Sequence, residues 1–314
     1  MTKITSVIGH EILDSRGNPT VGATVVLDDG TTASSAVPSG ASTGSREAVE
    51  LRDADPERYG GKGVLKAVGH VNGELAGAVV GLDATDQRAV DRAMIDLDGT
   101  PNKGRVGANA ILAISLAVLR AGAISTGTEL FQHIANLADN DSPIELPVPM
   151  FNVLNGGAHA MGSTDFQEFM LVPVGIDSFS EALRCGADMY QWLNKKLAAD
   201  GHATTVGDEG GFAPKGLTNR GALEYATAAI EGAGYRPGED VFIALDPASS
   251  EFYSDGVYDL SREGRKLSSE EMIEEYRILS KDFPIYSIED GLAEDDWAGW
   301  EMQTERVGSS RVKK

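Results

Sequence analysis

The feature that most constrains this fold is a pair of apolar segments that each end at an acidic residue. Residues 241–245 (Val-Phe-Ile-Ala-Leu) run into Asp246, and residues 285–288 (Ile-Tyr-Ser-Ile) run into Glu289. A capping box that begins at Ser268 predicts a helix between them. Near-continuous apolar strands joined by a helix are typical of a parallel sheet that is buried on both faces. We therefore expect an α/β architecture in this part of the chain.

The two acids at the strand ends are candidate metal ligands. An α/β barrel builds its active site from residues at the C-terminal ends of successive strands. Asp246 and Glu289 would then converge on one mouth, and their carboxylate oxygens are the donors that Mg²⁺ prefers. The alternative is that each acid only caps the helix that follows its strand, and position alone does not decide between the two interpretations.

The first third of the sequence has a different pattern. Apolar residues at positions 21, 23, 25 and 27 alternate with smaller or polar ones, which predicts a half-buried strand. Asp29-Gly30 predicts a hairpin turn into a further strand over residues 31–37. After Glu47 the pattern becomes helical and ends in an Ala-rich helix over residues 108–121. We expect an α+β domain, a three-stranded meander covered by helices.

A polar stretch over residues 136–149 predicts the boundary between two domains. We place the N-terminal α+β domain at residues 1–138 and the α/β domain at residues 143–314. A chain of 314 residues is long enough to bury a core in each.

Composition excludes several classes of function. The formal net charge of −21 argues against a nucleic-acid-binding protein, because such a protein needs basic residues to neutralise phosphates. The single cysteine, Cys185, excludes an intramolecular disulfide and a cysteine-based zinc cluster, and its helical surroundings predict a small core residue. The apolar fraction of 41% is that of an ordinary globular chain.

No segment predicts export or membrane insertion. The first residues lack the apolar run of a signal peptide. The longest apolar stretch, residues 108–121, is interrupted by Asn109, Ser115 and Arg120 and is shorter than the roughly 20 residues that span a bilayer. We interpret it as a buried helix, expect no membrane partner, and expect a cytoplasmic protein.

Three glycine-containing segments are candidate ligand-binding loops. Residues 206–214 set Asp208 and Glu209 among three glycines and a proline, a composition that favours neither helix nor strand. Residues 155–159 place His159 in a glycine loop, and residues 38–45 contain only small side chains that could close over an anion. The alternatives are an acidic turn, a solvated histidine and a flexible linker, respectively.

Residues 166–170 (Phe-Gln-Glu-Phe-Met) alternate aromatic and polar side chains. In a strand this places Gln167 and Phe169 on one face and Glu168 on the other.

Together these segments resemble enolases. The resemblance runs from residue 3 to about residue 300, and its most specific stretches are residues 15–20, 38–46, 59–64, 152–159, 165–170, 207–214, 250–253 and 287–297. It implies a lyase of glycolysis and gluconeogenesis that reversibly dehydrates 2-phosphoglycerate to phosphoenolpyruvate. It also implies two Mg²⁺ ions per site, an N-terminal cap domain and an enolase-type TIM barrel. The metals explain how an acidic protein binds a trianionic substrate.

The resemblance also implies roles for individual residues. Asp246 and Glu289 would hold the tightly bound metal, and Ser39 would reach the second metal as its loop closes. Glu209 would be the general acid that protonates the departing hydroxide, with Glu168 beside it as a catalytic group. The implied substrate-binding residues are His159, Gln167, Glu168 and Glu289.

Some of the family's elements have no counterpart by motif. These are a third metal-binding Asp, the Lys that removes the α-proton, a His-Arg-Ser segment and a second Lys. We therefore expect an apparently C-terminally truncated enolase with about half of a barrel, which typically needs eight strands. Without the Lys base we expect negligible turnover by this chain alone.

Three further expectations come from the resemblance. The alternative to an enzyme is a non-catalytic enolase-like protein that acts by interaction with a partner. A dehydratase of acid sugars in the same superfamily is disfavoured, because it would not be expected to share both the Ser39 loop and residues 207–214. Enolases are usually dimeric or larger, so we expect a homo-oligomer.

Overall fold

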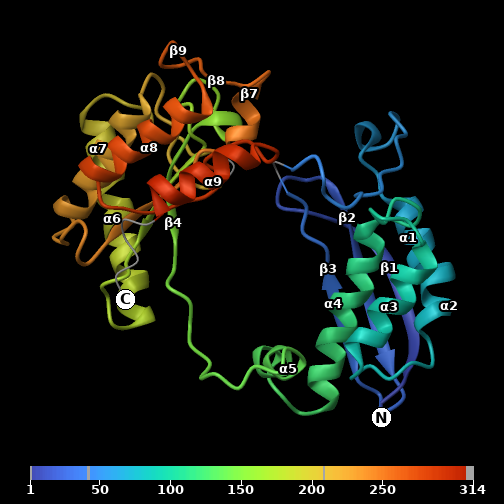
Figure 1. Ribbon diagram of the computed structural model, residues 1–314. Coiled ribbons are helices and arrows are strands. Elements are labelled where there is room, and N and C mark those ends of the chain that lie inside the picture. The colour runs from blue at the N-terminus through green and yellow to red at the C-terminus, as the bar shows by residue number, and fades with distance from the viewer. Residues whose placement is uncertain (1, 41–42, 208, 309–314) are drawn as a thin grey trace. The chain divides into compact units, whose positions relative to one another are not determined.

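The computed structural model describes residues 2–40, 43–207 and 209–308 (Figure 1). The chain divides into two compact units, Met1–Ile144 and Glu145–Lys314. Three expectations fall partly outside the described residues: the small-residue loop at Ala41 and Ser42, the acidic loop at Asp208, and the tail over residues 309–314.

The N-terminal unit is built on the predicted three-stranded meander. The antiparallel strands are β1 (Ile4–Leu13), β2 (Pro19–Leu27) and β3 (Thr32–Ala36), in the order β1-β2-β3. The predicted hairpin turn lies between β2 and β3. Gly30 adopts a φ of 86°, which is the left-handed region that glycine enters without strain. The N–H of Thr31 donates to the Asp29 carboxylate at 2.8 Å, which stabilises this turn.

Helices cover one face of this sheet (Figure 1). They are α1 (Leu65–His70), α2 (Ala76–Val79), α3 (Gln87–Asp98), α4 (Ala108–Ser125) and α5 (Leu130–Leu137), with short irregular turns at Tyr59–Gly61 and Val71–Leu75.

The predicted onset of helix directly after Glu47 is wrong, because the first α-helix begins at Leu65. The backbone before it bonds to distant segments instead of to itself. The N–H of Val49 donates to the carbonyl of Asn102, and the N–H of Leu51 donates to the side chain of Asn109. These long-range bonds outweigh the local helical preference.

The α4 helix is the centre of the N-terminal core. It packs on β2 and β3, and 10 of its residues are buried. Its length of 18 residues and its hydropathy would allow it to cross a membrane, but a buried core helix passes the same test. The packing on the sheet supports the predicted buried helix, which is longer than the sequence indicated.

The C-terminal unit contains a four-stranded sheet in the order β10-β6-β5-β4. The strands are β4 (Phe151–Asn155), β5 (Glu168–Val172), β6 (Phe242–Asp246) and β10 (Ile285–Ile288). The helices α6 (Phe179–Ala199), α7 (Asn219–Gly232), α8 (Ser269–Asp282) and α9 (Trp297–Arg306) belong to the same unit, as do the small strands β7 (Tyr253–Ser254), β8 (Val257–Leu260) and β9 (Arg265–Leu267). The capping box at Ser268 is present at the start of α8.

The two predicted strands pair in parallel, but the sheet as a whole is mixed. β6 and β10 are parallel, as predicted, but β4 pairs antiparallel with β5, and β5 pairs antiparallel with β6. The connection from β4 to β5 contains only a single 3₁₀ turn, Gly157–His159, and is too short for the helical crossover that a parallel pair requires. The chain therefore reverses direction between these strands.

The two faces of the sheet carry different side chains. Phe169, Leu171 and Leu245 belong to the large buried cluster that also includes residues of α6, α7 and α8. Met170, Val172 and Ala244 form a separate small apolar cluster on the opposite face. Glu168 and Asp246 pair two positions further along the same two strands, so their side chains lie on the same face as this small cluster.

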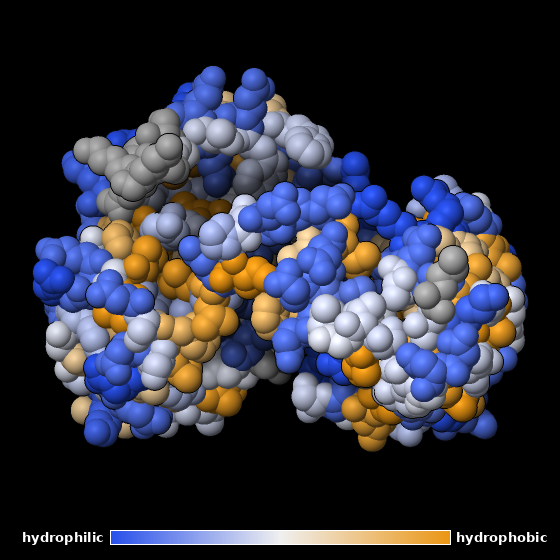
Figure 2. All heavy atoms as spheres, turned by 90° about the horizontal axis from the view of Figure 1, so that it is seen from below, coloured by the Kyte–Doolittle hydropathy of each residue, from blue (hydrophilic) through white to orange (hydrophobic). Residues whose placement is uncertain are grey.

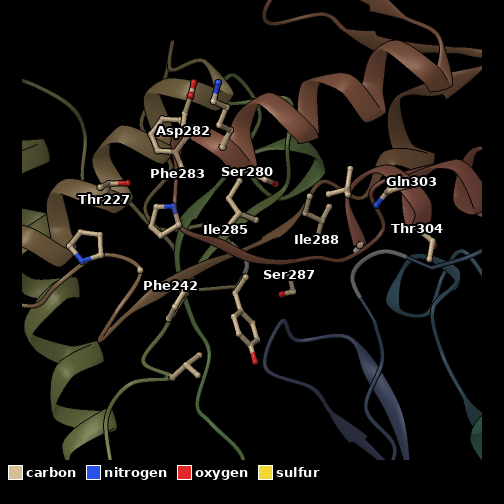
Figure 3. Close-up of a pocket in the computed structure, with 18 of the residues that line it drawn as sticks. Thr227, Phe242, Ser280, Asp282, Phe283, Ile285, Ser287, Ile288, Gln303 and Thr304 are labelled. Atoms are coloured by element: carbon tan, nitrogen blue, oxygen red, sulfur yellow. The ribbon is translucent and has the colours of Figure 1, made fainter. Parts of the chain in front are cut away.

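The described sheet does not close into a barrel, because its order runs only from β10 to β4. A groove of about 1420 Å³ lies along β10 and is walled by α9 and by the turn between α8 and β10 (Figure 3). Apolar side chains such as Phe242, Ile285 and Ile288 line it. Figure 2 shows that hydrophilic residues cover much of the visible face, with hydrophobic patches between them.

Candidate active site

Strand register places three carboxylates in one row. Glu168 is the direct partner of Asp246 in the pairing of β5 with β6. Leu245 pairs with Ile288 in the parallel ladder of β6 and β10, so Glu289 follows beside Asp246. The N–H of Glu289 donates to the Leu245 carbonyl at 2.8 Å, which holds this residue at the strand end. The row therefore combines the start of one strand with the ends of two others.

The three carboxylates lie on the same face of the sheet as the small apolar cluster of Met170, Val172 and Ala244. Met170 pairs with Ala244, two positions along from the pair of Glu168 and Asp246. Side chains two positions apart in a strand point to the same face, so these acids project on the side of Met170 and Ala244. Asn152 pairs with Met170 on that face as well, and neither atom of its amide group has a hydrogen-bond partner among the described residues.

The carboxylates of this row repel one another. Burial, together with the negative charges of Asp246, Glu209 and Glu289, raises the pKa of Glu168 to about 7. Burial also raises the pKa of Asp246 to about 6. The N–H of Ala248, which donates to Asp246 at 2.9 Å, opposes this shift, while Glu289 and Asp290 add to it. Two half-buried acids, Glu168 and Asp246, therefore lie near the exposed Glu209 and Glu289 without a compensating cation among these neighbours.

This donor set fits a divalent cation. Carboxylate oxygens are hard ligands of the kind that Mg²⁺ prefers, and a bound cation would relieve the mutual repulsion of Asp246 and Glu289. The third predicted metal ligand, Ser39, lies in the N-terminal unit. There its hydroxyl donates to Glu50 at 3.2 Å, and Arg16 donates to its carbonyl at 2.7 Å. Its role as a ligand stays a prediction.

His159, Glu168 and Glu209 form a second group beside the row. One potential ligand atom from each lies within 4.8 Å of the other two. Nδ1 of His159 is 3.6 Å from Oε1 of Glu168, which is too long for a hydrogen bond. His159 is only 9% exposed, and neither ring nitrogen has a hydrogen-bond partner among the described residues. Such an imidazole is a ready site for a ligand.

Gln167 directly precedes β5, and because neighbouring residues of an extended segment face opposite sides, its side chain lies away from this group. Its backbone N–H donates to the Asp246 carbonyl at 3.2 Å, and its side chain is 2% exposed with Oε1 unpartnered among the described residues. It lines a cavity of about 230 Å³ together with Gly157, Asp165 and Arg262, and this cavity is not lined by Glu168. The predicted opposition of Gln167 and Glu168 agrees with this arrangement.

Asn155 is a site residue that the sequence interpretation missed. Its side chain accepts a hydrogen bond from the N–H of Gly211 at 2.9 Å, and its backbone N–H donates to the Phe212 carbonyl at 2.8 Å. A Cβ atom added at Gly211 would lie 2.8 Å from Oδ1 of Asn155, so only glycine fits there. The glycine-rich loop therefore packs its backbone against β4 and holds Glu209 near His159.

The chain matches two family models in tandem. The model described as "Enolase, N-terminal domain" covers residues 4–134, and the model described as "Enolase, C-terminal TIM barrel domain" covers residues 143–312. The chain belongs to the enolase family. The meander and its helices are the enolase N-terminal domain, and the acid row lies in the segment that matches the barrel domain.

Family membership agrees with the expected fold class, an α+β domain followed by an enolase-type barrel segment. The described part of that segment supplies four strands of the main sheet and no closed barrel.

Proposed function

We propose that this chain carries the metal-binding and proton-donating residues of an enolase, which reversibly dehydrates 2-phosphoglycerate to phosphoenolpyruvate in the cytoplasm. The observation that carries the proposal is the row of Glu168, Asp246 and Glu289 on adjacent strands. Aligned carboxylates at one edge of a barrel sheet suit a reaction whose substrate is a trianion and whose cofactor is a divalent cation.

In this proposal Asp246 and Glu289 hold a Mg²⁺ ion, and Ser39 contributes to a second ion. When bound, the metals supply positive charge that stabilises the substrate carboxylate as its neighbouring carbon loses a proton. The protein's contribution is to hold two carboxylates side by side through the hydrogen-bonded ladder of β6 and β10.

Glu209 and Glu168 supply the proton that the departing hydroxide takes up. Glu209 is exposed on its loop and donates a proton to the departing hydroxide. Glu168 has a pKa of about 7, raised by burial and by its acidic neighbours, so it holds a proton part of the time near neutral pH and can return it to Glu209. His159 binds the substrate, with Glu168 and Glu289 also facing it, whereas the substrate-binding role of Gln167 rests on the resemblance alone, because its side chain lines the other cavity.

Removal of the α-proton needs a base that these residues do not supply. The acids near the site would be poor bases for so weak a carbon acid, and no residue matches the family's Lys by motif. We therefore expect the purified chain to bind 2-phosphoglycerate but to turn it over at a negligible rate.

Isothermal titration calorimetry with 2-phosphoglycerate tests the proposal. We expect binding that requires Mg²⁺, that is lost in Glu289→Gln, and that a sugar acid does not compete away. The matched control Glu231→Gln changes an exposed acid of α7 and should bind normally.

Two outcomes contradict parts of this proposal. Absence of 2-phosphoglycerate binding in the presence of Mg²⁺ would reject the substrate and favour a non-catalytic role through an interaction partner. Turnover close to that of an intact enolase would reject the expectation that the base is missing.

A further inference from the structure

We propose that residues 144–150 of one chain add as an edge strand to β10 in a second copy of this chain. The contact joins an open edge of the main sheet to an exposed apolar segment that directly precedes β4. Neither pairs with another strand among the described residues. The inference does not depend on the proposed function, because neither feature includes a carboxylate of the acid row.

The open edge of the main sheet lies along β10. At the opposite edge Leu154 of β4 forms a bridge with Phe212, whereas no described strand pairs with the outer side of β10. Ile288 lies opposite Leu245, and the next residue, Glu289, donates its N–H to the Leu245 carbonyl. Neighbouring residues of a strand direct their backbone groups to alternate sides, so the N–H and C=O of Ile288 point outward. Such outward groups are a template for a further strand.

The groove beside this edge is apolar. Phe242, Ile288 and Trp300 line it (Figure 3), and so does Tyr286, whose side chain is 57% exposed. A strand added here would therefore gain backbone hydrogen bonds along β10 and apolar contacts with these side chains.

The segment ahead of β4 has the pattern of a strand without being paired as one. Residues 143–150 form neither helix nor strand and run as an extended connection (Figure 1). The side chains of Leu146, Val148 and Met150 are 73%, 47% and 50% exposed, respectively. Their spacing of two residues places all three on one face of an extended chain.

Two prolines restrict this segment to the edge of a sheet. In a strand the backbone groups of Leu146, Val148 and Met150 would point to one side, and those of Pro147 and Pro149 to the other. Proline has no N–H, so only the first side carries a full set of donors. Prolines in sheets accordingly occur in edge strands, with the missing donors facing away from the sheet. The segment therefore suits a strand that pairs on one side and ends the sheet on the other.

The segment cannot reach β10 of its own chain. In the order β10-β6-β5-β4, β4 lies three strand spacings from β10, a distance of about 14 Å. Val148 is three residues from Phe151, the first residue of β4, and three residues span at most roughly 11 Å. The partner is therefore another chain. Each copy offers one segment and one edge, so two copies that exchange segments form a closed dimer.

Charge also bears on the contact. The net charge of −21 makes two copies repel one another. Residues 143–150 carry a single charged side chain, Glu145, so this segment approaches a second copy with little repulsion. Salt screens the repulsion between the remaining charges, so the dimer should become more stable as ionic strength rises.

Size-exclusion chromatography with light scattering tests the contact on the full chain, over about a hundredfold range of concentration. We expect a mass of twice 33.1 kDa at the upper end. Leu146→Lys and Tyr286→Lys should each weaken the dimer at least about tenfold, because each would bring a charge into the apolar contact. Both side chains are exposed in the single chain, so neither substitution threatens its fold. The matched control Leu183→Lys changes an exposed leucine of α6 and should leave the dimer unchanged.

A mixture of the two variants shows which surfaces touch. Leu146→Lys keeps an intact β10 edge, and Tyr286→Lys keeps an intact segment. The mixture should dimerise at a concentration at which neither variant does so alone, because it restores one complete contact. Hydrogen exchange gives a second readout: the N–H of Val148 should exchange more slowly at high concentration than at low concentration, as expected for a new strand bond.

Four outcomes would overturn the proposal. They are a monomer at every concentration, a dimer that both variants retain, an equal loss of the dimer in Leu183→Lys, and a mixture that fails to associate. Slow exchange at Val148 that is independent of concentration would place the segment on its own chain and reject the second copy. None of these outcomes affects 2-phosphoglycerate binding, which tests the proposed function separately.

Discussion

Asp98 and Asp246 are both aspartates at the end of a secondary-structure element, one in each unit, but their surroundings are opposite. Asp98 ends α3 and accepts hydrogen bonds from the N–H groups of Thr100, Arg105 and Val106 and from the Thr100 hydroxyl. Burial opposes its ionisation, yet these donors lower its pKa on balance. Asp246 has one such donor, and burial raises its pKa.

The difference separates an acid whose charge is compensated from acids that a ligand would have to compensate. In the N-terminal unit the polar groups around Asp98 compensate its charge fully, so the carboxylate stabilises the fold. In the C-terminal unit the carboxylates face one another, which is a destabilising arrangement that a bound cation would relieve. A group of charges without compensating partners is a better indicator of function than acidic residues as such.

The largest expected change in stability is in the N-terminal unit, in which hydrogen-bond donors compensate the charge of Asp98. Asp98→Ala should lower the free energy of unfolding of the N-terminal unit by about 3 kcal/mol, because it leaves several buried donors unsatisfied. Asp96→Ala, at an exposed position of the same helix, should have almost no effect. Urea unfolding followed by circular dichroism measures both. A change of similar size in the two variants would contradict the structural role of Asp98.

Mg²⁺ should raise the stability of the C-terminal unit. At 100 times its Kd the ion should stabilise the C-terminal unit by about 2.7 kcal/mol, because it binds only the folded state. The effect should vanish in Asp246→Asn and persist in Asp177→Asn, which changes an exposed aspartate. All three tryptophans, Trp192, Trp297 and Trp300, lie in this unit, so their fluorescence follows its unfolding selectively. No upward shift with Mg²⁺ would mean that the acid row does not hold the metal.

The ion pair between Glu11 and Arg58 should lose its stabilising effect at acidic pH. A bidentate ion pair with Arg58 lowers the pKa of Glu11 from its ordinary value of 4.5. Its stabilisation is therefore present above pH 4.5 and is lost as pH falls through the lowered value. Glu11→Gln should cost about 2 kcal/mol at pH 7 and flatten the acid side of the stability profile. An unchanged acid profile would show that the pair contributes nothing.

The smallest expected effect is an increase in stability, whereas the substitutions above reduce it. With a chelator present, Glu168→Gln should stabilise the C-terminal unit at pH 8 by about 1 kcal/mol, since it removes one of the crowded charges. The folded state holds the proton of Glu168 more tightly than the unfolded state, so the gain should disappear as pH falls from about 7 to 4.5. Tryptophan fluorescence in urea at several pH values measures this. A variant that is less stable than the wild type at pH 8 would indicate that the carboxylates are already compensated.

The sequence predicted the strand ends at Asp246 and Glu289 because local apolar runs and the turn residues around them carry that information. It did not predict the direct pairing of Glu168 with Asp246, because the register of β5 against β6 depends on packing between distant segments. The antiparallel pairing of β4 with β5 was not predicted for the same reason: its direction follows from a connection whose path local patterns do not specify.

Asn155 was missed for a different reason. It is one of several polar residues in a glycine-containing segment, and nothing in that segment indicates that its amide would contact Gly211. The helical pattern after Glu47 failed because the backbone there bonds to Asn102 and Asn109, which are far away in the sequence.

The pairing of strands from distant parts of the chain also bears on how the protein folds. The site draws on residues from position 155 to position 289, so it depends on contacts of high sequence separation. Such contacts form late, after local helices and hairpins have reduced the entropy of loop closure. The meander of the N-terminal unit, with neighbouring strands, should fold early, whereas the carboxylates meet only near the end of folding. The carboxylates of the row therefore come close enough to repel one another only when the packed strands already hold them in place.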